Sequence, residues 1–354
     1  MRTSTILSEA WRNLASGTTR ALLFAGLFAG LVGTLALADT LTISTLQTRA
    51  EQFRESGAAI RTLVAEGHID ADSCDALTAA SPVSAAGALA AGRPVTFSVM
   101  PGSSVPSFDV TPGFADVIAL DSRQPAGVWI SEPLSDSLKA SPGTILATTA
   151  GPLTIAGTFP WPDDGRDSRL GYAVLIPTRS EIALDECWAT IWPTSQAADN
   201  QLRAAATVDV ASTTPLNLSQ VNKNHGTTFD GNAEYLARLT RGVPLLGALT
   251  ALLLGYTASR VRRLEYAGAL HAGATKASTL ATALVETFVW AVTGALVAAA
   301  VLAVVARQDP GSFAPVFLTS AKVALIGVSS SLIGAAIAVT SIRERHLFRF
   351  FKDR

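Results

Sequence analysis

The sequence contains few charged residues. Asp, Glu, Lys and Arg make up 16% of its 354 residues, whereas a soluble globular domain has about 25%. The deficit is concentrated in four stretches that carry no charge apart from Glu286: residues 21–38, 242–259, 277–306 and 323–342. A helix that crosses a bilayer needs about 20 apolar residues. The pattern therefore excludes an ordinary soluble protein and predicts four membrane-spanning helices.

The sequence also lacks the motifs of common catalytic sites. It has no phosphate-binding loop of the form G-x-x-x-x-G-K-S/T, no paired-histidine metal motif, no G-x-S-x-G and no C-x-x-C. Its four histidines, His68, His225, His271 and His346, are scattered along the chain. We therefore expect no catalysis, no metal ion and no cofactor in this chain, and no nucleic-acid partner.

The signs of the charges divide the chain between two sides of a membrane. Residues 1–20, 260–276 and 343–354 together hold 12 Lys and Arg residues against four acids, whereas residues 39–241 hold 13 against 22. Short loops rich in Lys and Arg remain in the cytoplasm. We therefore expect a multi-pass protein of the cell membrane with both termini cytoplasmic and residues 39–241 outside.

The predicted fold class is a membrane α-helical protein in which one helix is followed by a large extracytoplasmic mixed α/β domain and then by three more helices. The predicted segments are a cytoplasmic amphipathic N-terminal helix (1–20), a first membrane helix (21–45), an extracytoplasmic stalk and α/β domain (46–235), a second membrane helix (240–259), a cytoplasmic loop (260–279), a third membrane helix (280–306), an outer loop (307–317), a fourth membrane helix (318–341) and a cytoplasmic tail (342–354). An apolar run ending in Ala36, Leu37 and Ala38 also fits a cleaved secretory signal, but its length favours a retained helix.

Residues 67–230 have the pattern of strands and turns. Short apolar runs are separated by Gly, Pro, Ser and Asp, and we expect strands at residues 95–99, 117–120, 127–130, 153–156 and 172–176. A short helix is expected from Leu134 to Ala140, and the first membrane helix is expected to continue as a stalk through residues 46–66.

Cysteine is almost absent. Cys74 and Cys187 are the only two, and both lie in the segment expected outside the membrane, where disulfides form and persist. We favour a disulfide between them over two unrelated buried thiols.

Two patterns near the N-terminus suggest contacts with lipid or with another helix. Residues 1–19 are amphipathic, with Ala10 and Trp11 on the apolar side and Asn13 on the polar side, so this helix is expected at the membrane surface with Trp11 at the interface. Gly26 and Gly30 form a G-x-x-x-G pair that allows close helix packing. Ordinary glycine usage in a membrane helix explains the pair equally well.

The segment from Arg260 to Lys276 is short, basic and rich in helix-forming residues. Its basic residues anchor the topology. A simple anchor has no need of the apolar run from Tyr266 to Leu270, which predicts a small apolar surface that docks into a groove on a partner.

This segment resembles the signature of the FtsX/MacB-like (type VII) ABC transporter permease family. Glu265, Ala267, Gly273, Ala274 and Thr275 match that signature at its spacing. Residues 8–14 resemble the entry motif of the family, and residues 128–134, 143–146 and 153–158 resemble its periplasmic core domain. This chain departs from the family pattern at positions 270 and 272, where it has Leu and Ala.

The resemblance implies a non-catalytic permease subunit that works with a separate ATPase, and it is that ATPase which binds ATP and magnesium. The implied coupling residues are Arg262, Arg263, Glu265, Tyr266, Ala267, Leu270, Gly273, Ala274 and Thr275. The other implied partners are a second permease copy, membrane lipid and an extracytoplasmic protein or peptide cargo. The expected output is mechanical work outside the membrane, such as export of a drug, peptide or lipid-linked cargo. The alternative is a membrane-anchored regulator or sensor without cargo.

Two carboxylates lie within or beside the apolar stretches. Glu286, which matches a glutamate of the family, is expected to be structural or coupling and to pair with Arg262, Arg263 or Lys276, because a charge in an apolar helix is costly unless paired. The alternative is that it lies close enough to the headgroups to stay hydrated. Asp39, at the outer edge of the first helix, is expected to be solvated. Apart from Glu286 and the cluster Ser329, Ser330 and Ser331, the helices offer little polar surface for a channel.

Overall fold

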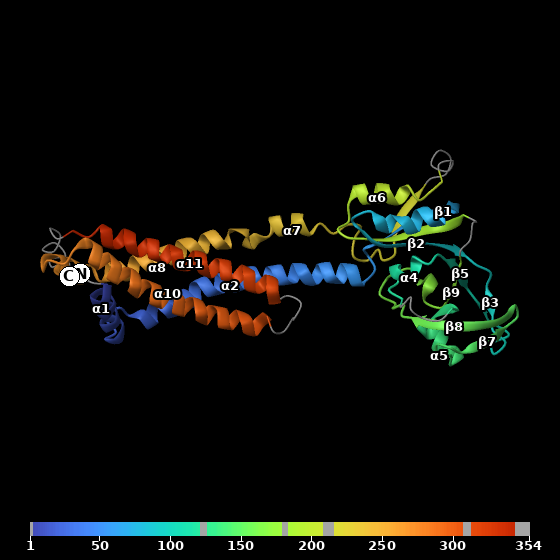
Figure 1. Ribbon diagram of the computed structural model, residues 1–354, viewed down its shortest axis with the longest axis horizontal. Helices are drawn as coiled ribbons and strands as arrows, with labels where there is room; N and C mark the ends of the chain where they lie inside the picture. The colour runs from blue at the N-terminus through green and yellow to red at the C-terminus, as the bar shows by residue number, and fades with distance from the viewer. Residues whose placement is uncertain (1–2, 121–125, 179–182, 208–215, 307–312, 344–354) are drawn as a thin grey trace. The chain divides into compact units, whose positions relative to one another are not determined.

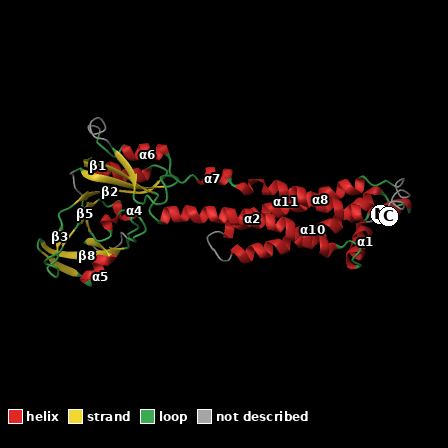
Figure 2. Cartoon of the chain, turned by 180° about the vertical axis from the view of Figure 1, so that it is seen from behind, coloured by secondary structure: helices red, strands yellow, loops and turns green. Residues whose placement is uncertain are grey.

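The computed structural model describes residues 3–120, 126–178, 183–207, 216–306 and 313–343. The chain forms two compact units. The helical unit consists of residues 1–48 and 232–354, and the sheet domain consists of residues 49–231. Helices dominate the first unit and strands the second (Figures 1 and 2).

Four described helical segments are long and apolar enough to cross a membrane: Ala21–Glu55, Leu239–Val261, Lys276–Val304 and Ala321–Thr340. Each contains most of one uncharged stretch of the sequence. The described helices outside the body of the sheet domain are α1 (Thr3–Ala15), α2 (Ala21–Glu55), α7 (Gly231–Ala237), η3 (Leu239–Gly242), α8 (Val243–Val261), α9 (Arg263–His271), α10 (Lys276–Ala306) and α11 (Phe313–Thr340).

Helices α8 and α11 approach each other so closely that two contacts tolerate only glycine. A Cβ atom on Gly255 would lie 1.9 Å from the carbonyl oxygen of Ser331, and one on Gly334 would lie 2.0 Å from that of Leu252. Small residues at such contacts are typical of membrane helices, because lipid leaves close packing as the main source of helix association.

Helix α2 packs beside α10 through aromatic side chains. The rings of Phe24 and Phe28 lie 5.7 and 6.3 Å from that of Trp290. Val32 of α2 and Val323 of α11 belong to the same buried cluster. Ala251 of α8 lies in it too, so the apolar faces of all four membrane-length helices meet in one core.

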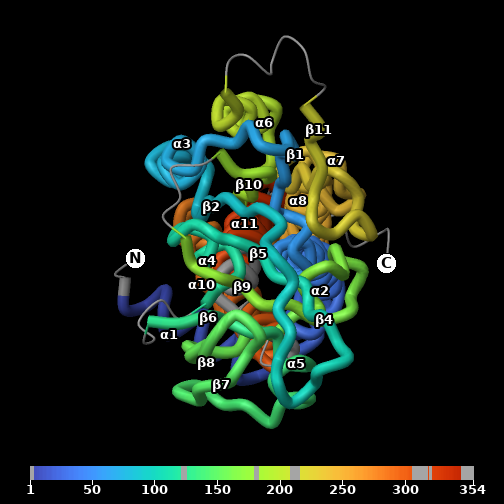
Figure 3. Tube along the Cα trace, turned by 90° about the vertical axis from the view of Figure 1, so that its right-hand side faces the viewer, coloured from blue at the N-terminus to red at the C-terminus, as the bar shows by residue number. Residues whose placement is uncertain are grey.

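The sheet domain is built on a nine-stranded mixed sheet. Its strand order is β11-β1-β10-β2-β5-β9-β6-β8-β7, which can be followed in Figure 3. The β5–β9 and β6–β8 pairs are parallel, and the other described pairs are antiparallel. The strands are β1 (Ile60–Ile69), β2 (Val83–Ala91), β5 (Ser107–Val110), β6 (Val128–Ser131), β7 (Ile145–Thr148), β8 (Gly151–Phe159), β9 (Val174–Pro177), β10 (Leu184–Ile191) and β11 (Asn217–Gln220), with the separate pair β3 (Val95–Thr96) and β4 (Ser104–Val105).

Short helices pack on this sheet and form the domain core with it. They are α3 (Ala71–Asp75), η1 (Ala76–Ala79), α4 (Phe114–Val117), α5 (Glu132–Leu138), η2 (Ser168–Leu170) and α6 (Gln196–Arg203). Trp188 and Phe114 are buried together, with ring centroids 5.3 Å apart. The predicted disulfide is present: Cys74 of α3 and Cys187 of β10 are joined, with Cα atoms 5.9 Å apart.

The structure corrects two local predictions and agrees with several others. Helix α2 ends at Glu55 rather than at residue 66, because Gly57 has a φ of +78° and β1 begins at Ile60. Residues 117–120 are not a strand, since Val117 ends helix α4; a short apolar run does not distinguish a strand from a buried helical turn. Strands β6, β8 and β9 and helix α5 lie where expected.

Candidate functional site

The segment between α8 and α10 is a short helix between two turns. Helix α8 ends at Val261, Arg262 breaks the helix, and α9 runs from Arg263 to His271. Helix α10 then begins at Lys276. The segment predicted as a loop at 260–279 is therefore largely helical, and most of the expected coupling residues belong to α9 and the turn that follows it.

The turn after α9 explains why this sequence has glycine at position 273. Gly273 has a φ of +92°, which side chains rarely tolerate. Its amide donates to the carbonyl of Leu270 at 3.1 Å, and the amide of Ala274 donates to that of Ala269 at 3.0 Å. This pair of bonds is a Schellman motif, which satisfies carbonyl groups left unpaired at a helix end.

Thr275 starts helix α10. Its hydroxyl oxygen accepts from the amide of Ser278 at 3.2 Å, which is the geometry of an N-cap. The matched residues Gly273, Ala274 and Thr275 thus form one compact turn that stops α9 and starts α10. The motif is explained by helix geometry, and a role in partner binding stays a prediction.

A buried ion pair lies directly behind α9. Arg262 donates from Nη1 to Oε2 of Glu286 on α10 and from Nε to Glu265 at 2.7 Å. The side chains of Arg262 and Glu286 are 9% and 4% exposed, so neither is hydrated at the surface. Of the three expected partners of Glu286, which were Arg262, Arg263 and Lys276, Arg262 is the one that pairs with it.

Tyr266 completes the surroundings of Arg262. Nη1 of Arg262 lies 3.3 Å from the Tyr266 hydroxyl, and the guanidinium carbon lies 5.1 Å from the ring centre. Burial alone would lower the pKa of Arg262, but the nearby carboxylates of Glu286 and Glu265 outweigh it and raise this pKa. Burial also raises the pKa of Tyr266. Arg262 therefore stays charged and the phenol stays neutral.

Asn13 extends the network to the N-terminal helix. Its Nδ2 donates to Oε1 of Glu286 at 2.7 Å, so both carboxylate oxygens of Glu286 are bound. Ala10, one turn earlier on α1, is buried, whereas Trp11 is 71% exposed. The prediction that Asn13 lies opposite Ala10 is wrong, because Asn13 is one helical turn from Ala10 and bonds to Glu286 on the same side. The place of Trp11 at the membrane interface stays a prediction.

A cavity of about 230 Å³ lies beside this network and is lined mainly by polar side chains, including those of Glu9, Asn13, Glu265, Thr279 and Thr282. It is formed by α1, α9 and the start of α10. The network and the cavity are continuous, because Asn13, Arg262 and Glu265 belong to both.

The expected apolar docking surface is only partly exposed. Tyr266 and Ala267 are buried, in a cluster with Ala283, Val339 and Ile342. Among the remaining coupling residues, Arg263, Leu270 and Ala274 are half-buried. Between Arg263 and Thr275, the exposed residues are Glu265 and those of the turn from His271 to Thr275, apart from Ala274. Tyr266 and Ala267 therefore hold α9 in place instead of presenting a surface.

A second buried ion pair lies elsewhere in the helical unit. Nε of Arg238 lies 3.2 Å from Oδ1 of Asp39, and the two side chains are 9% and 1% exposed. The guanidinium of Arg238 also stacks on Tyr235, 3.8 Å from the ring centre. The expectation that Asp39 is solvated is wrong, because the connection from α7 to α8 covers it.

Gly26 and Gly30 face open space. A Cβ atom on either would meet nothing within 4 Å, and both residues are exposed. The close helix contacts of this chain use other glycines, such as Gly255 and Gly334. A packing role for Gly26 and Gly30 therefore stays a prediction about a second molecule.

Comparison with known proteins gives similarity to two solved extracytoplasmic domains. No family model and no curated protein matches the chain. The periplasmic region of MacB from Actinobacillus actinomycetemcomitans is similar at 11% identity and a TM-score of 0.34, over 50% of this chain and 94% of that one. The extracellular domain of the ABC-type transporter YknZ from Gram-positive bacteria is similar at 14% identity and a TM-score of 0.31, over 46% of this chain and all of that one. At these values the similarity carries no conclusion about this chain.

Proposed function

We propose that this chain is the permease subunit of a type VII-like ABC transporter and that it couples ATP hydrolysis in a separate subunit to mechanical work outside the membrane. The observation that carries the proposal is the exposed turn that connects α9 with α10. The Arg262–Glu286 ion pair supports this turn from behind. The sequence of this turn resembles the permease signature, and the chain has no phosphate-binding loop of its own.

The exposed turn is the proposed docking surface. Ala272 and Gly273 have little or no side chain, so a partner can approach the backbone closely. The partner ATPase would bind ATP and magnesium in the cytoplasm. Force applied to the turn would reach α10 through the bond from Arg262 to Glu286, and α1 through the bond from Asn13 to the same carboxylate.

Helix α2 provides the proposed path to the outside. It has 35 residues, about 15 more than a bilayer core requires. Its excess length supports a helix that leaves the membrane and carries motion into the sheet domain. In this proposal both termini are cytoplasmic, the sheet domain is extracytoplasmic, a second copy completes the transporter, and the chain itself catalyses nothing.

The proposal is tested by co-purification of the chain from gently solubilised membranes. We expect a protein with a phosphate-loop motif to co-purify with the native chain and to be lost with Ala272→Arg, which adds bulk and charge to the exposed turn without touching the buried network. Ser137→Arg on exposed helix α5 is the matched control and is expected to retain the partner. Retention by both variants would refute docking at the turn. Absence of any ATPase from the native sample would refute the permease function.

A further inference from the structure

The carboxyl end of α2 is bound inside the sheet domain by a complete set of hydrogen bonds. A helix end leaves its last carbonyl groups without partners in the helix. Here the carbonyl of Gln52 accepts from the Ser56 amide at 2.9 Å and that of Arg54 from the Gly57 amide at 3.2 Å. The carbonyl of Phe53 accepts from the Ser56 hydroxyl at 3.2 Å.

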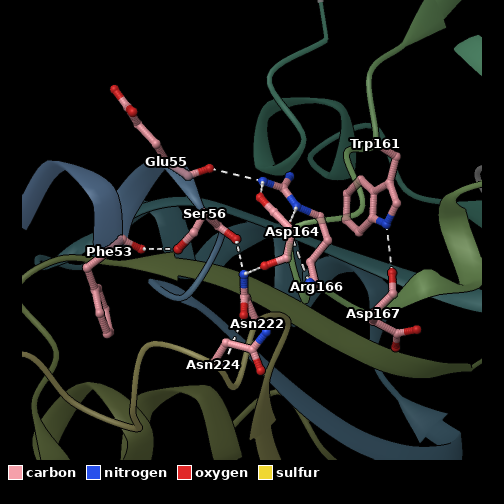
Figure 4. Close-up of polar contacts among 9 residues, drawn as sticks. All are labelled: Phe53, Glu55, Ser56, Trp161, Asp164, Arg166, Asp167, Asn222 and Asn224. Atoms are coloured by element: carbon pink, nitrogen blue, oxygen red, sulfur yellow. Dashed lines mark hydrogen bonds and ion pairs between the residues drawn. The ribbon is translucent and has the colours of Figure 1, made fainter.

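The next two carbonyl groups are bound by side chains from distant parts of the sequence. Nη2 of Arg166 donates to the carbonyl of Glu55 at 3.1 Å, and Nδ2 of Asn222 donates to that of Ser56 at 3.0 Å (Figure 4). A positive charge at this position is also favourable, because the carboxyl end of a helix carries partial negative charge.

Arg166 is itself held rigidly. Its Nε and Nη2 donate to the two carboxylate oxygens of Asp164 at 2.9 and 2.7 Å. Its guanidinium carbon lies 5.1 Å from the centre of the Trp161 ring. The intervening Gly165 has a φ of +96°, and a Cβ atom there would lie 1.8 Å from Asn224. This turn therefore presents Arg166 to α2 in one fixed geometry.

Asn222 is completely buried and joins three segments. Besides Ser56, its Nδ2 donates to the carbonyl of Asp164 at 3.2 Å, and its Oδ1 accepts from the amide of Asn224 at 3.0 Å. Asn222 follows β11 and lies where the chain begins to leave the domain. The segment that enters the domain and the segment that leaves it are therefore tied together by one side chain.

An aromatic cluster ties the same two segments a second time. Phe53 of α2 lies 5.8 Å from Phe229, and both rings pack against Trp192, which follows β10, at 6.0 and 5.7 Å. Phe53 is 2% exposed. All of these residues belong to the sheet domain, so polar and apolar contacts act on the same joint.

We propose that Arg166 and Asn222 are positioning residues that lock the end of α2 and the outgoing segment into a single rigid joint, so that motion of α2 moves the sheet domain as one body. The inference has two parts, the rigidity of the joint and the transmission of motion from α2 to the sheet domain. The second part rests on the proposed permease function. Neither residue contacts a cargo or a partner in this role. They act through the two connecting segments, residues 49–57 and 221–231.

The rigidity of the joint is tested by pulsed electron paramagnetic resonance on the full-length protein in lipid nanodiscs. Spin labels are placed at Gln52→Cys on α2 and Ser137→Cys on α5, both exposed; both native cysteines are in the disulfide. We expect a narrow distance distribution in the otherwise native protein and a broad one after Asn222→Ala. An equally narrow distribution in Asn222→Ala would overturn the proposal.

Two further variants separate positioning from general destabilisation. Ile69→Ala opens a cavity in a different cluster of the domain core, away from the labelled helix α5, and is expected to lower stability while the distribution stays narrow. Arg166→Met removes the bond to Glu55 near the surface and is expected to broaden the distribution even if Asn222→Ala does not fold. Broadening in Ile69→Ala to the same extent would reduce Arg166 and Asn222 to ordinary structural residues and overturn the proposal.

The transmission of motion to the sheet domain is tested in the complex with the co-purified ATPase. The readout is the ATP-dependent displacement of a label at Ser137→Cys relative to the lipid headgroups. We expect loss of this displacement in Arg166→Met with continued ATP turnover. Unchanged displacement in Arg166→Met would contradict the proposed role of the joint but not the proposed permease function. Absence of displacement in the native complex would contradict the proposed function and leave the measured rigidity of the joint intact.

Discussion

The interior of each of the two units is stabilised by a different kind of contact. In the sheet domain the core consists of large apolar side chains, among them Trp188, Phe114 and Phe159. Of the twelve largest fully buried side chains among the described residues, only Phe28 lies in the helical unit. The helical unit instead uses close backbone contact, as at Gly255 and Gly334.

This difference follows from the solvent that each unit is expected to meet. A domain in water gains free energy by burying apolar surface. Helices in lipid gain little from burial, because lipid tails are as apolar as leucine, and they associate through packing and polar contacts. The two buried ion pairs of the helical unit, Arg262–Glu286 and Asp39–Arg238, fit this picture.

The largest expected effect compares one phenylalanine from each unit. Phe159→Ala in the sheet domain should lower the free energy of unfolding by about 3–5 kcal/mol, the usual cost for a buried Phe. Phe28→Ala should cost clearly less, because lipid solvates the lost surface. Denaturant unfolding of each unit in nanodiscs checks this, and equal losses would break the comparison.

The next effect concerns the ion pair behind α9. Arg262→Met leaves Glu286 charged, buried and without its cation, which should cost about 3–5 kcal/mol. The double variant Arg262→Met/Glu286→Leu should recover most of this loss, since no unpaired charge remains. Thermal unfolding of the two variants decides the point, and a double variant as unstable as the single one would show that the pair itself stabilises the unit.

A smaller effect distinguishes the glycines of the helical unit. Gly255→Ala places a Cβ atom against the Ser331 carbonyl and should cost about 1–3 kcal/mol through overpacking. Gly26→Ala is the matched control within the same unit, because its Cβ would meet open space. Size-exclusion profiles after heating compare the two. If Gly26→Ala loses a dimer that Gly255→Ala retains, Gly26 contacts a second copy of the chain instead.

The smallest effect is expected at the turn. Gly273→Ala forces an L-residue to a φ of +92°, which should cost about 1 kcal/mol. The variant should remain folded, and partner binding should weaken because the turn shifts. Titration of the purified ATPase onto the reconstituted chain measures this. Gly268→Ala, in the middle of α9, is the control and should bind normally.

The sequence predicts some of these features well because their signals are local. Strands β6, β8 and β9 follow from short apolar runs between turn residues, and the Cys74–Cys187 pairing follows from there being only two cysteines in one segment. The position of α9 was not predicted, but its composition already indicated a helix-forming segment. Apolar stretches without charge likewise indicate the membrane-length helices directly.

Other features depend on contacts between distant residues, so no local pattern predicts them. Asn13 belongs to the polar side of its helix by sequence and turns inward only because Glu286 lies opposite. Asp39 is covered by Arg238, almost 200 residues away. Asn222 has no motif around it and gains its importance from the end of α2. Likewise, spacing singled out Gly26 and Gly30, whereas the backbone contacts fall at Gly255 and Gly334.

The central claim is that the turn after α9 docks on a cytoplasmic ATPase, and a single cysteine at Ala272 tests it most directly. Both native cysteines are in the disulfide, so Ala272→Cys supplies the one thiol available for a photoreactive crosslinker. We predict that membrane-impermeant thiol reagents reach this cysteine only from the cytoplasmic side, and that the crosslinked product contains a protein with a phosphate-loop motif. Labelling from the outside, or crosslinking to lipid alone, would contradict the account.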